Sequence, residues 1–555
     1  MPTNSNIRQK LGQLIMLDFR YWGEDSNNQR IPFTKTNDIV NKIFKNYNLG
    51  GFILFRENIQ NNEQVISLLR DLQANTNTPI FFATDQEGGR VNRLQQGTSG
   101  CGNMALAATD NPSNAYTMAK IIGDELYSLG ININFAPAVD VNSNKNNPII
   151  GVRSYSDNPN VVTDYAKNAI NGYHDAKIID CIKHFPGHGD TATDSHLGNV
   201  ILDKTLKELQ TTELLPFSKL ARDCSMIMTA HISVPALDDT QYQSVSTSEN
   251  IYVPTTLSYK IITKLLKQQM KFDGLVVSDA MDMHAIAKHF GTIEASKLAI
   301  LAGIDILLMP IRVWSENDLY KLEELFCELE NEYNQNPNFA NAVDNAYTNI
   351  TDFKAKHKLD KSLIFKLSYD EQLKYANQIV NCSKHQLISL DIAKQSTTVV
   401  KNLGIIPCNL NMLKNILIVD SDRQRMADFH NELQKIVSKN NSAIIINSEN
   451  IDNQDIKNSI ENADLILLIS ANLREYNKAY SYVTSIKPEQ TINIAALAPY
   501  DINYIDNIIN YVCIYGATSM DQTNYTKTSL KINIQAALEN IFSDNILTGK
   551  LPVQI

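Results

Sequence analysis

Eight short apolar runs alternate with amphipathic stretches through the first three-fifths of the chain. The runs, which predict strands, span residues 13–19, 51–55, 80–85, 133–141, 179–184, 226–232, 274–281 and 304–309. Helical patterns lie between them, at residues 62–75, 114–129, 161–176, 206–222, 258–269 and 285–302. Apolar strands without polar alternation are buried on both faces, so the pattern predicts an α/β fold with an N-terminal TIM-type (β/α)8 barrel. A doubly wound open sheet is the alternative, but no G-x-G-x-x-G motif follows an early strand.

The length of 555 residues exceeds what one hydrophobic core supports, and the sequence pattern changes near Trp314. We expect the barrel to cover residues 1–340, a helical linker 341–387, and a smaller α/β sandwich domain 388–555. Strand-like runs in the last part span residues 415–419, 443–447, 463–470, 491–498 and 511–515. Beyond Asp420, few titratable residues follow these runs, which favours a structural or substrate-capping role for this domain.

Charge and cysteine usage exclude several classes of partner. The net charge is −10 and no Lys/Arg-rich run is present, which argues against nucleic acid and acidic membranes. No apolar run approaches the roughly 20 residues that span a bilayer. The seven scattered cysteines form no C-x-x-C pair, which argues against a disulfide framework and a thiolate metal site. The first residues lack a signal-peptide pattern, so we expect a cytoplasmic protein; an exported chain whose signal was removed is the alternative.

Charged and titratable residues follow most of the predicted barrel strands. They are Asp85, Asp140, Arg153, Lys183, His184, His231 and Asp279. Because barrel enzymes place their working residues at the carboxyl ends of strands, these residues predict a polar cup lined by both signs of charge. Asp279 directly after an apolar run suits a rigidly held nucleophile. The other interpretation is a helix N-cap, a role that Asp282 would fill instead.

The densest group of titratable residues follows the fifth predicted strand, in the segment KHFPGHGDTATDSH at residues 183–196. His184 and His188 have i,i+4 spacing, but Pro186 and Gly187 between them disfavour a helical metal site. Asp194 and His196 are two apart and point the same way in an extended chain. The carboxylate would then orient the imidazole and raise its pKa, which makes a general acid usable near neutral pH. Glycines on the near side of the loop would let it move over a substrate.

This segment resembles the hallmark of the glycoside hydrolase family 3 β-N-acetylglucosaminidases (β-hexosaminidases). Supporting stretches are TDQEGGRV at 84–91, NFAPAVDV at 134–141, GVRSY at 151–155, MTAH at 228–231 and VSDAM at 277–281. The ending GKLPV at 549–553 resembles the close of the family's second domain, which indicates the two-domain form.

The resemblance implies a retaining double displacement. Asp279 matches the family's nucleophile, and His196 paired with Asp194 matches the acid/base of this subgroup, whereas other members use a glutamate from the second domain. The sugar-binding positions implied by the resemblance are Asp85, Arg153, Lys183 and His184, with Arg93 and His231 as neighbours. His188 would pack the loop.

The resemblance further implies an exo-acting enzyme that removes non-reducing terminal GlcNAc from peptidoglycan-derived fragments such as muropeptides. We expect no cofactor, no metal and a monomer. Three alternatives stay open: a β-glucosidase or β-xylosidase of the same family, a GlcNAc phosphorylase, and a non-catalytic cell-wall sugar-binding protein. Phosphorolysis is compatible because a histidine acid/base is neutral after giving up its proton, and repels an anionic acceptor less than a glutamate would.

Overall fold

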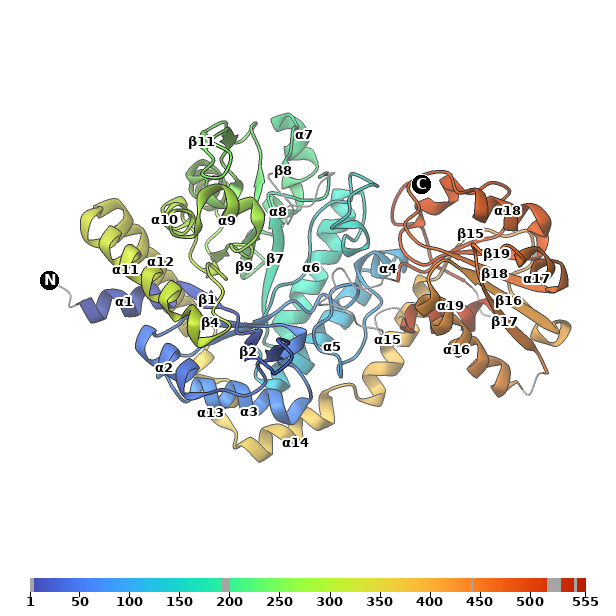
Figure 1. Cartoon of the computed structure of the whole chain (residues 1–555), viewed down its shortest axis with the longest axis horizontal. Coiled ribbons are helices and arrows are strands. Elements are labelled where there is room, and N and C mark those ends of the chain that lie inside the picture. The colour runs from blue at the N-terminus through green and yellow to red at the C-terminus, as the bar shows by residue number, and fades with distance from the viewer. Residues whose placement is uncertain (1–3, 192–199, 441–442, 517–530, 544–546) are drawn as a thin grey trace.

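The structure is a computed structural model that describes residues 4–191, 200–440, 443–516, 531–543 and 547–555. A larger N-terminal body, coloured blue to yellow-green in Figure 1, lies beside a smaller C-terminal body, coloured orange. Yellow helices pass beneath the first body and lead to the second.

The N-terminal body is built on eight parallel strands, one at each predicted apolar run; β7 extends one residue beyond its run, to Phe185. They are β1 (Ile15–Leu17), β4 (Gly51–Leu54), β5 (Phe81–Thr84), β6 (Ile133–Asn134), β7 (Ile179–Phe185), β9 (Met226–Thr229), β13 (Leu275–Val277) and β14 (Leu307–Leu308). Hydrogen-bonded neighbours follow the order β13-β9-β7-β6-β5-β4-β1-β14. A parallel bridge between Val277 and Ile306 joins the two ends of this sheet. The predicted barrel is therefore confirmed.

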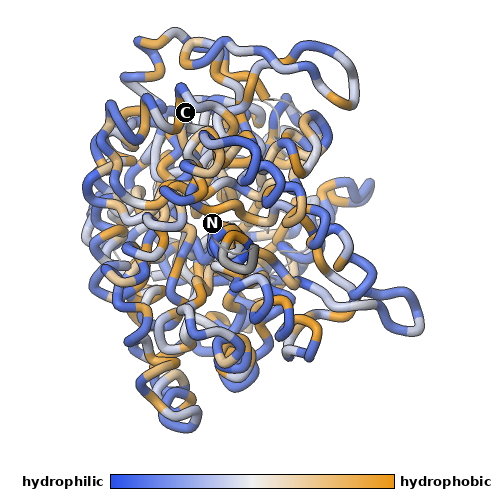
Figure 2. Tube along the Cα trace, turned by 90° about the vertical axis from the view of Figure 1, so that its left-hand side faces the viewer, coloured by the Kyte–Doolittle hydropathy of each residue, from blue (hydrophilic) through white to orange (hydrophobic). Residues whose placement is uncertain are grey.

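The barrel strands are apolar because both of their faces are covered. Every residue of β1, β4, β5, β7, β9 and β13 is buried. Inward side chains fill the barrel and outward side chains meet the surrounding helices, so no polar alternation is expected. Figure 2 shows hydrophilic segments over most of the outer loops and hydrophobic segments running through the interior.

Helices surround the barrel. The principal ones are α2 (Asp38–Tyr47), α3 (Asn62–Gln73), α5 (Ser113–Leu129), α6 (Pro159–Asp175), α8 (Leu214–Leu220), α10 (Thr292–Ala302) and α11 (Leu319–Gln335). Two predicted helices are interrupted. The pattern at 206–222 divides into α7 (Leu206–Thr211) and α8, and the pattern at 285–302 divides into α9 (His284–Phe290) and α10 at Gly291, whose φ is +74°. Among the helices in the described ranges, none is both long and apolar enough to cross a bilayer.

The helical region after the barrel stays attached to it. Helix α12 (Pro337–Lys356) packs on α1 (Asn4–Gln13), α10 and α11, so residue 340 lies inside a helix that covers the barrel. Near its end, the buried Lys354 amine donates to Gln13 Oε1 at 2.7 Å. Helix α14 (Tyr369–Ile379) then packs on α3 and α5, and α15 (Ser383–Ser396) leads into the second domain.

The C-terminal domain holds a six-stranded sheet between helices. Its strands, in spatial order, are β15 (Thr398–Lys401), β20 (Tyr511–Cys513), β19 (Thr491–Ala495), β18 (Leu465–Ser470), β16 (Asn415–Asp420) and β17 (Ile445–Asn450). All neighbours are parallel except β15 and β20, and β15 lies outside the predicted runs. Helices α16 (Arg423–Lys439), α18 (Lys478–Ile486) and α19 (Lys531–Ile541) accompany the sheet. The predicted α/β architecture of this part is confirmed.

The second domain contacts the barrel next to the loop that follows β6. Asn142 Nδ2 donates to Tyr500 Oη at 2.8 Å, and Arg474 Nη1 donates to the carbonyl oxygen of Asn146 at 2.8 Å. This loop also supports the start of the segment after β7, because Asn147 Nδ2 donates to the His188 carbonyl at 2.8 Å. The two domains therefore meet close to the carboxyl ends of the barrel strands.

Candidate active site

A cavity of about 300 Å³ opens at the carboxyl ends of the barrel strands. Six of the nine site residues expected from the sequence line it: Asp85, Arg93, Arg153, Lys183, His184 and Asp279. The position agrees with where barrel enzymes carry out their chemistry. Two further expected residues, Asp194 and His196, lie outside the described residues.

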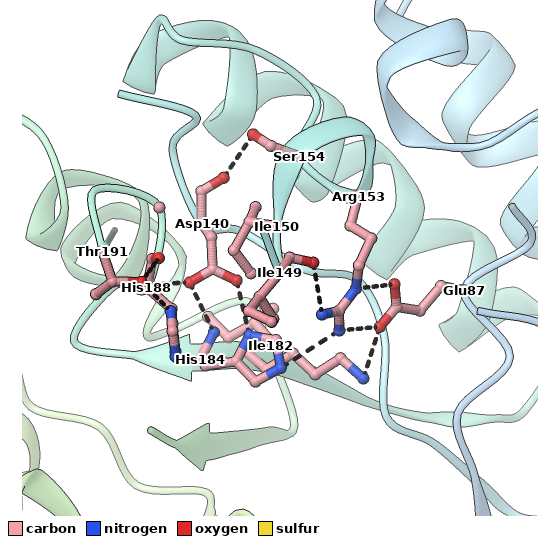
Figure 3. A network of polar contacts seen from close by, with 12 residues as sticks. Glu87, Asp140, Ile149, Ile150, Arg153, Ser154, Ile182, His184, His188 and Thr191 are labelled. Carbon is pink, nitrogen blue, oxygen red and sulfur yellow. Dashed lines mark hydrogen bonds and ion pairs between the residues drawn. The ribbon is translucent and has the colours of Figure 1, made fainter. Parts of the chain in front are cut away.

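A chain of ion pairs forms one wall of the cavity. Lys183 Nζ lies 2.8 Å from Asp85 Oδ1 and 2.9 Å from Glu87 Oε1. Arg153 donates through Nε and Nη2 to the two oxygens of Glu87, at 2.9 and 2.7 Å (Figure 3). Arg93 Nη2 lies 3.6 Å from Asp85 Oδ2. The wall therefore contains two buried or half-buried carboxylates held by three cations.

These pairings keep the wall ionised. Burial alone would raise the pKa of Glu87, but attraction to Arg153 and Lys183 brings this pKa far below its usual range. Burial would likewise raise the pKa of Asp85, but attraction to Lys183 and Arg93 lowers it. Burial would lower the pKa of Lys183, but Asp85 and Glu87 raise it. All of these groups are charged at neutral pH, and charged donors and acceptors bind hydroxyl groups more strongly than neutral ones.

A fully buried carboxylate, Asp140, holds two histidines beside this wall (Figure 3). Its Oδ2 lies 2.7 Å from His184 Nδ1, and its Oδ1 accepts from the backbone N–H groups of His184 and His188, at 3.2 and 2.7 Å. The other ring nitrogen of His184 lies 3.4 Å from Arg153 Nη2. Burial would raise the pKa of Asp140, yet attraction to His184 lowers it. Asp140 thus fixes the ring of His184 where it faces the cavity.

His188 also lines the cavity, and its ring contacts the start of the loop that follows β7. The residue is 3% exposed, and its Nδ1 lies 2.6 Å from Thr191 Oγ1. Burial lowers the pKa of His188 to about 4. The imidazole is therefore neutral at neutral pH.

His231 follows its strand as expected but is not among the residues that line the cavity. Its Nδ1 lies 2.8 Å from Thr256 Oγ1 and its Nε2 lies 3.0 Å from the carbonyl oxygen of Ala280. The ring is buried and connects the strand end to the backbone just after Asp279. These contacts favour a positioning role for His231 over direct contact with a ligand.

Asp279 lies half-buried at the end of β13, on the side of the cavity away from Glu87. Its backbone N–H donates to the Thr229 carbonyl at 3.2 Å, and its Oδ1 accepts from the Ala280 N–H at 2.8 Å. Neither expected helix cap is present: α9 begins after Met283 without a side-chain cap. The suggestion that Asp282 is the cap was wrong, because its carboxylate pairs with Arg312. Backbone groups of Thr229 and Ala280 therefore help to hold Asp279 at the cavity.

The glycines after β7 have a packing role that the expected loop mobility did not include. A Cβ added to Gly189 would lie 1.6 Å from the carbonyl oxygen of Val141, and Gly187 has a φ of +129° against Glu213. Beyond them, Lys204 Nζ lies 2.6 Å from Glu213 Oε1 and 3.2 Å from Asp190 Oδ2. These contacts tie together the described residues on both sides of 192–199.

Sequence reasoning missed the central role of Glu87. The signal was its spacing of two residues from Asp85, which lets both side chains leave the strand end on the same side. It also missed Arg20 and Arg312, which line the cavity from the ends of β1 and β14. In the described part of the chain, no group of three or more His, Cys, Asp or Glu side chains is arranged to hold a metal ion.

The arrangement joins a carboxylate at the mouth of a barrel to a wall of charged hydrogen-bonding groups. Such a wall binds a ligand rich in hydroxyl groups, and a fixed carboxylate opposite it attacks or stabilises an electrophilic carbon.

Comparison with known proteins identifies the family of this chain. The model of the glycosyl hydrolase family 3 N-terminal domain matches residues 6–346. The beta-hexosaminidase A of Pseudoalteromonas piscicida is 34% identical over 99% of this chain and 96% of its own length. A beta-hexosaminidase of Idiomarina loihiensis is 32% identical over 47% of this chain and 76% of its own length.

Solved structures extend the likeness over both domains. The family 3 beta-N-acetylglucosaminidase from Paenibacillus sp. str. FPU-7 has a TM-score of 0.78 at 26% identity, over 99% of this chain and 98% of its own. The beta-glucoside phosphorylase BglX bound to 2FGlc has a TM-score of 0.78 at 21% identity, over 99% and 94%, a likeness of fold alone. The resemblance read from the motifs is confirmed: this chain belongs to glycosyl hydrolase family 3 and is a glycoside hydrolase.

Proposed function

We propose that the protein is a retaining exo-β-N-acetylglucosaminidase that removes non-reducing terminal GlcNAc from peptidoglycan-derived fragments. Asp279 attacks the anomeric carbon and forms a glycosyl-enzyme, while His196, oriented by Asp194, protonates the leaving oxygen. The same histidine then takes a proton from water, which hydrolyses the intermediate. Asp85, Arg153, Lys183 and His184 bind the hydroxyl groups of the sugar, and Arg93 lies beside them.

The observation that carries the proposal is the placement of Asp279 opposite the charged wall of one small cavity. Retaining chemistry needs a nucleophile rigidly aimed at one carbon, with the acid/base on the order of 5 Å away. The short backbone contacts of Asp279 supply the rigidity. The segment with Asp194 and His196 begins after Thr191, whose hydroxyl contacts His188 at the cavity wall.

The relatives support the choice of sugar. The similar proteins include a beta-hexosaminidase and a beta-N-acetylglucosaminidase, names that denote action on N-acetylated amino sugars. All seven cysteines are free, which supports a reducing compartment and the turnover of recycled wall fragments there.

The test compares aryl β-glycosides of GlcNAc, glucose and xylose. We expect the GlcNAc substrate to be preferred by at least about 100-fold in kcat/KM, since the expected acid/base pair marks the hexosaminidase subgroup. Asp279→Ala should abolish turnover, while Asp273→Ala, a matched change at an exposed position six residues away, should not. A preference for glucoside or xyloside would overturn the choice of sugar, and an active Asp279→Ala variant would overturn the nucleophile.

The cell-wall assignment needs its own comparison. Release of GlcNAc from GlcNAc–anhydro-MurNAc should be faster than release from N,N′-diacetylchitobiose at equal concentration. Equal rates, or faster cleavage of chitobiose, would contradict a wall-fragment substrate.

A further inference from the structure

The cavity has a second wall, to which the expected sugar-binding residues contribute only Arg93. Going round the barrel from Asp279, the strand ends of β14, β1 and β4 contribute Arg312, Arg20 and Phe55 before Asp85 is reached on β5. Arg93, in the loop after β5, borders the same wall. Arg20, Arg93 and Arg312 therefore line one side of the cavity, and Arg93, which also approaches Asp85, joins this side to the charged network of Glu87.

Arg20 and Arg93 lie against the ring of Phe55. The guanidinium carbon of Arg20 lies 3.5 Å from the ring centroid, and that of Arg93 lies 5.1 Å from it. Stacking on an aromatic ring holds a guanidinium by its flat face. Its N–H groups lie in the plane of the guanidinium, so stacking does not occupy them.

These donors are poorly satisfied for groups so well buried. The side chains of Arg20 and Arg93 are 14% and 8% exposed. Within the described residues, the buried Nε of each has no hydrogen-bond acceptor. The carboxylates of Asp18 and Asp85 approach them only to 3.6 Å, beyond hydrogen-bonding distance. Buried donors are normally paired. Both side chains line the cavity, so an acceptor supplied by a ligand would pair with the guanidinium N–H groups that face it.

The carboxylates beside Arg20 and Arg93 also have other partners. Asp18 is buried behind it and already accepts from Trp314 Nε1 at 3.0 Å, and burial raises the pKa of Asp18 to about 6. Asp85 is shared with Lys183, and Asp282 pairs with Arg312. The half-exposed Arg312, 5.1 Å from the ring of Trp314, completes the wall at its rim.

We propose that Arg20 and Arg93, placed on Phe55 with Arg312 at the rim, form an anion-binding subsite for an oxyanion carried by the substrate. The inference rests on the proposed glycosidase function and deepens it, because it makes negative charge on the substrate a determinant of specificity. Two positions on a substrate would supply this chemistry: a carboxylate on the leaving sugar, or a sulfate or phosphate on O6 of the bound GlcNAc.

The experiment uses two matched substrate pairs on the full-length protein. The first is GlcNAc-β-1,4-MurNAc, with its lactyl carboxylate, against the methyl ester of the same disaccharide. The second is 4-methylumbelliferyl GlcNAc-6-sulfate against the unsulfated glycoside. We expect at least one anionic member to exceed its neutral partner by 10-fold or more in kcat/KM, and the pair that does so identifies the position of the anion.

Variants then assign the preference to the subsite. Arg20→Met should reduce the anionic-to-neutral ratio by 10-fold or more, and Arg312→Gln, at a half-exposed position that leaves the fold intact, should reduce it by 3-fold or more. Arg222→Gln removes the same charge from an exposed position outside the cavity and should leave the ratio unchanged. Ratios near one for both pairs in the unmodified enzyme, or a ratio that survives both variants, would overturn the subsite. Absence of turnover on unsulfated 4-methylumbelliferyl GlcNAc would instead refute the proposed function itself.

Discussion

Glu87 and Arg153 form a two-point ion pair in the charged wall of the cavity, with Arg153 Nη2 2.7 Å from Glu87 Oε1 and Arg153 Nε 2.9 Å from Glu87 Oε2. Both side chains are buried, and Glu87 also accepts the ammonium of Lys183. The carboxylate therefore fixes two of the four residues proposed to bind the sugar.

Replacing Glu87 with Gln should destabilise the barrel and impair catalysis together. The change leaves Arg153 and Lys183 buried with one counterion fewer, and breaking a buried ion pair costs about 3 to 5 kcal/mol. Urea unfolding followed by aromatic fluorescence, with kcat/KM on an aryl GlcNAc substrate, measures both effects. Glu489→Gln, the same change at an exposed position of the second domain, is the control. A Glu87→Gln enzyme of normal stability and rate would remove Glu87 from this role.

Asp140 and His184 should behave as one unit in mutant kinetics. Asp140→Asn loses the charge that holds the imidazole at 2.7 Å, so we expect kcat/KM to fall on the order of 100-fold, mostly through KM. His184→Ala should cost at least as much. Since Asp140 acts through His184, the double variant should be little worse than His184→Ala alone. Additive losses would show that the two residues act independently.

Protonation of His188 should weaken the fold in mild acid. Because the folded pKa of about 4 lies below the unfolded value near 6.5, the unfolded chain binds more protons between these values. Neutral His188 makes its full contribution to the free energy of unfolding above pH 6.5. This free energy falls by about 3 kcal/mol as the pH drops to 4. His188→Gln should flatten this part of the stability curve measured by urea unfolding from pH 7 to 4. An unchanged slope would show that His188 does not cause this loss of stability. The pKa of His357 is also lowered, to about 4, so His357 contributes the same pH dependence to the unmodified protein and to the variant.

Gly189→Ala should displace the loop that follows β7. No rotamer relieves a Cβ at 1.6 Å from the Val141 carbonyl, so the backbone must shift. We expect kcat/KM to fall by at least 10-fold, together with a lower melting temperature. Gly404→Ala, at a positive φ of 100° but with open space around it, should affect stability by about 1 kcal/mol and leave kcat/KM unchanged. A fully active Gly189→Ala enzyme would show that this loop tolerates a shift.

The strands were predictable because burial on both faces leaves a simple apolar signal. The apolar signal failed to give the correct strand length at residues 133–141, which were predicted as one strand. Regular pairing there covers only Ile133–Asn134, with one later bridge between Ala138 and Lys183. The irregular stretch carries Asp140 to the ring of His184. A run of apolar residues does not reveal such a departure from the sheet.

The lining of the cavity was predictable where a residue's position along its strand places it there, as for Lys183 and Asp279. It was not predictable where a residue's place in the site depends on contacts with residues far away in the sequence. Glu87 depends on cations from β7 and from the loop after β6. Arg20 depends on Phe55, thirty-five residues away in the sequence. His231 follows a strand like the others, but Thr256 and the Ala280 carbonyl take both of its ring nitrogens.

The proposed mechanism requires Asp279 to become covalently glycosylated. A 5-fluoro-GlcNAc donor with an activated leaving group slows hydrolysis of the intermediate, so mass spectrometry of the inactivated protein and its peptides tests the claim directly. We predict that the intact mass increases by one fluorinated GlcNAc residue, that the label lies on Asp279, and that Asp279→Asn takes up none. A label on another carboxylate, or labelling of Asp279→Asn, would show that Asp279 is not the nucleophile.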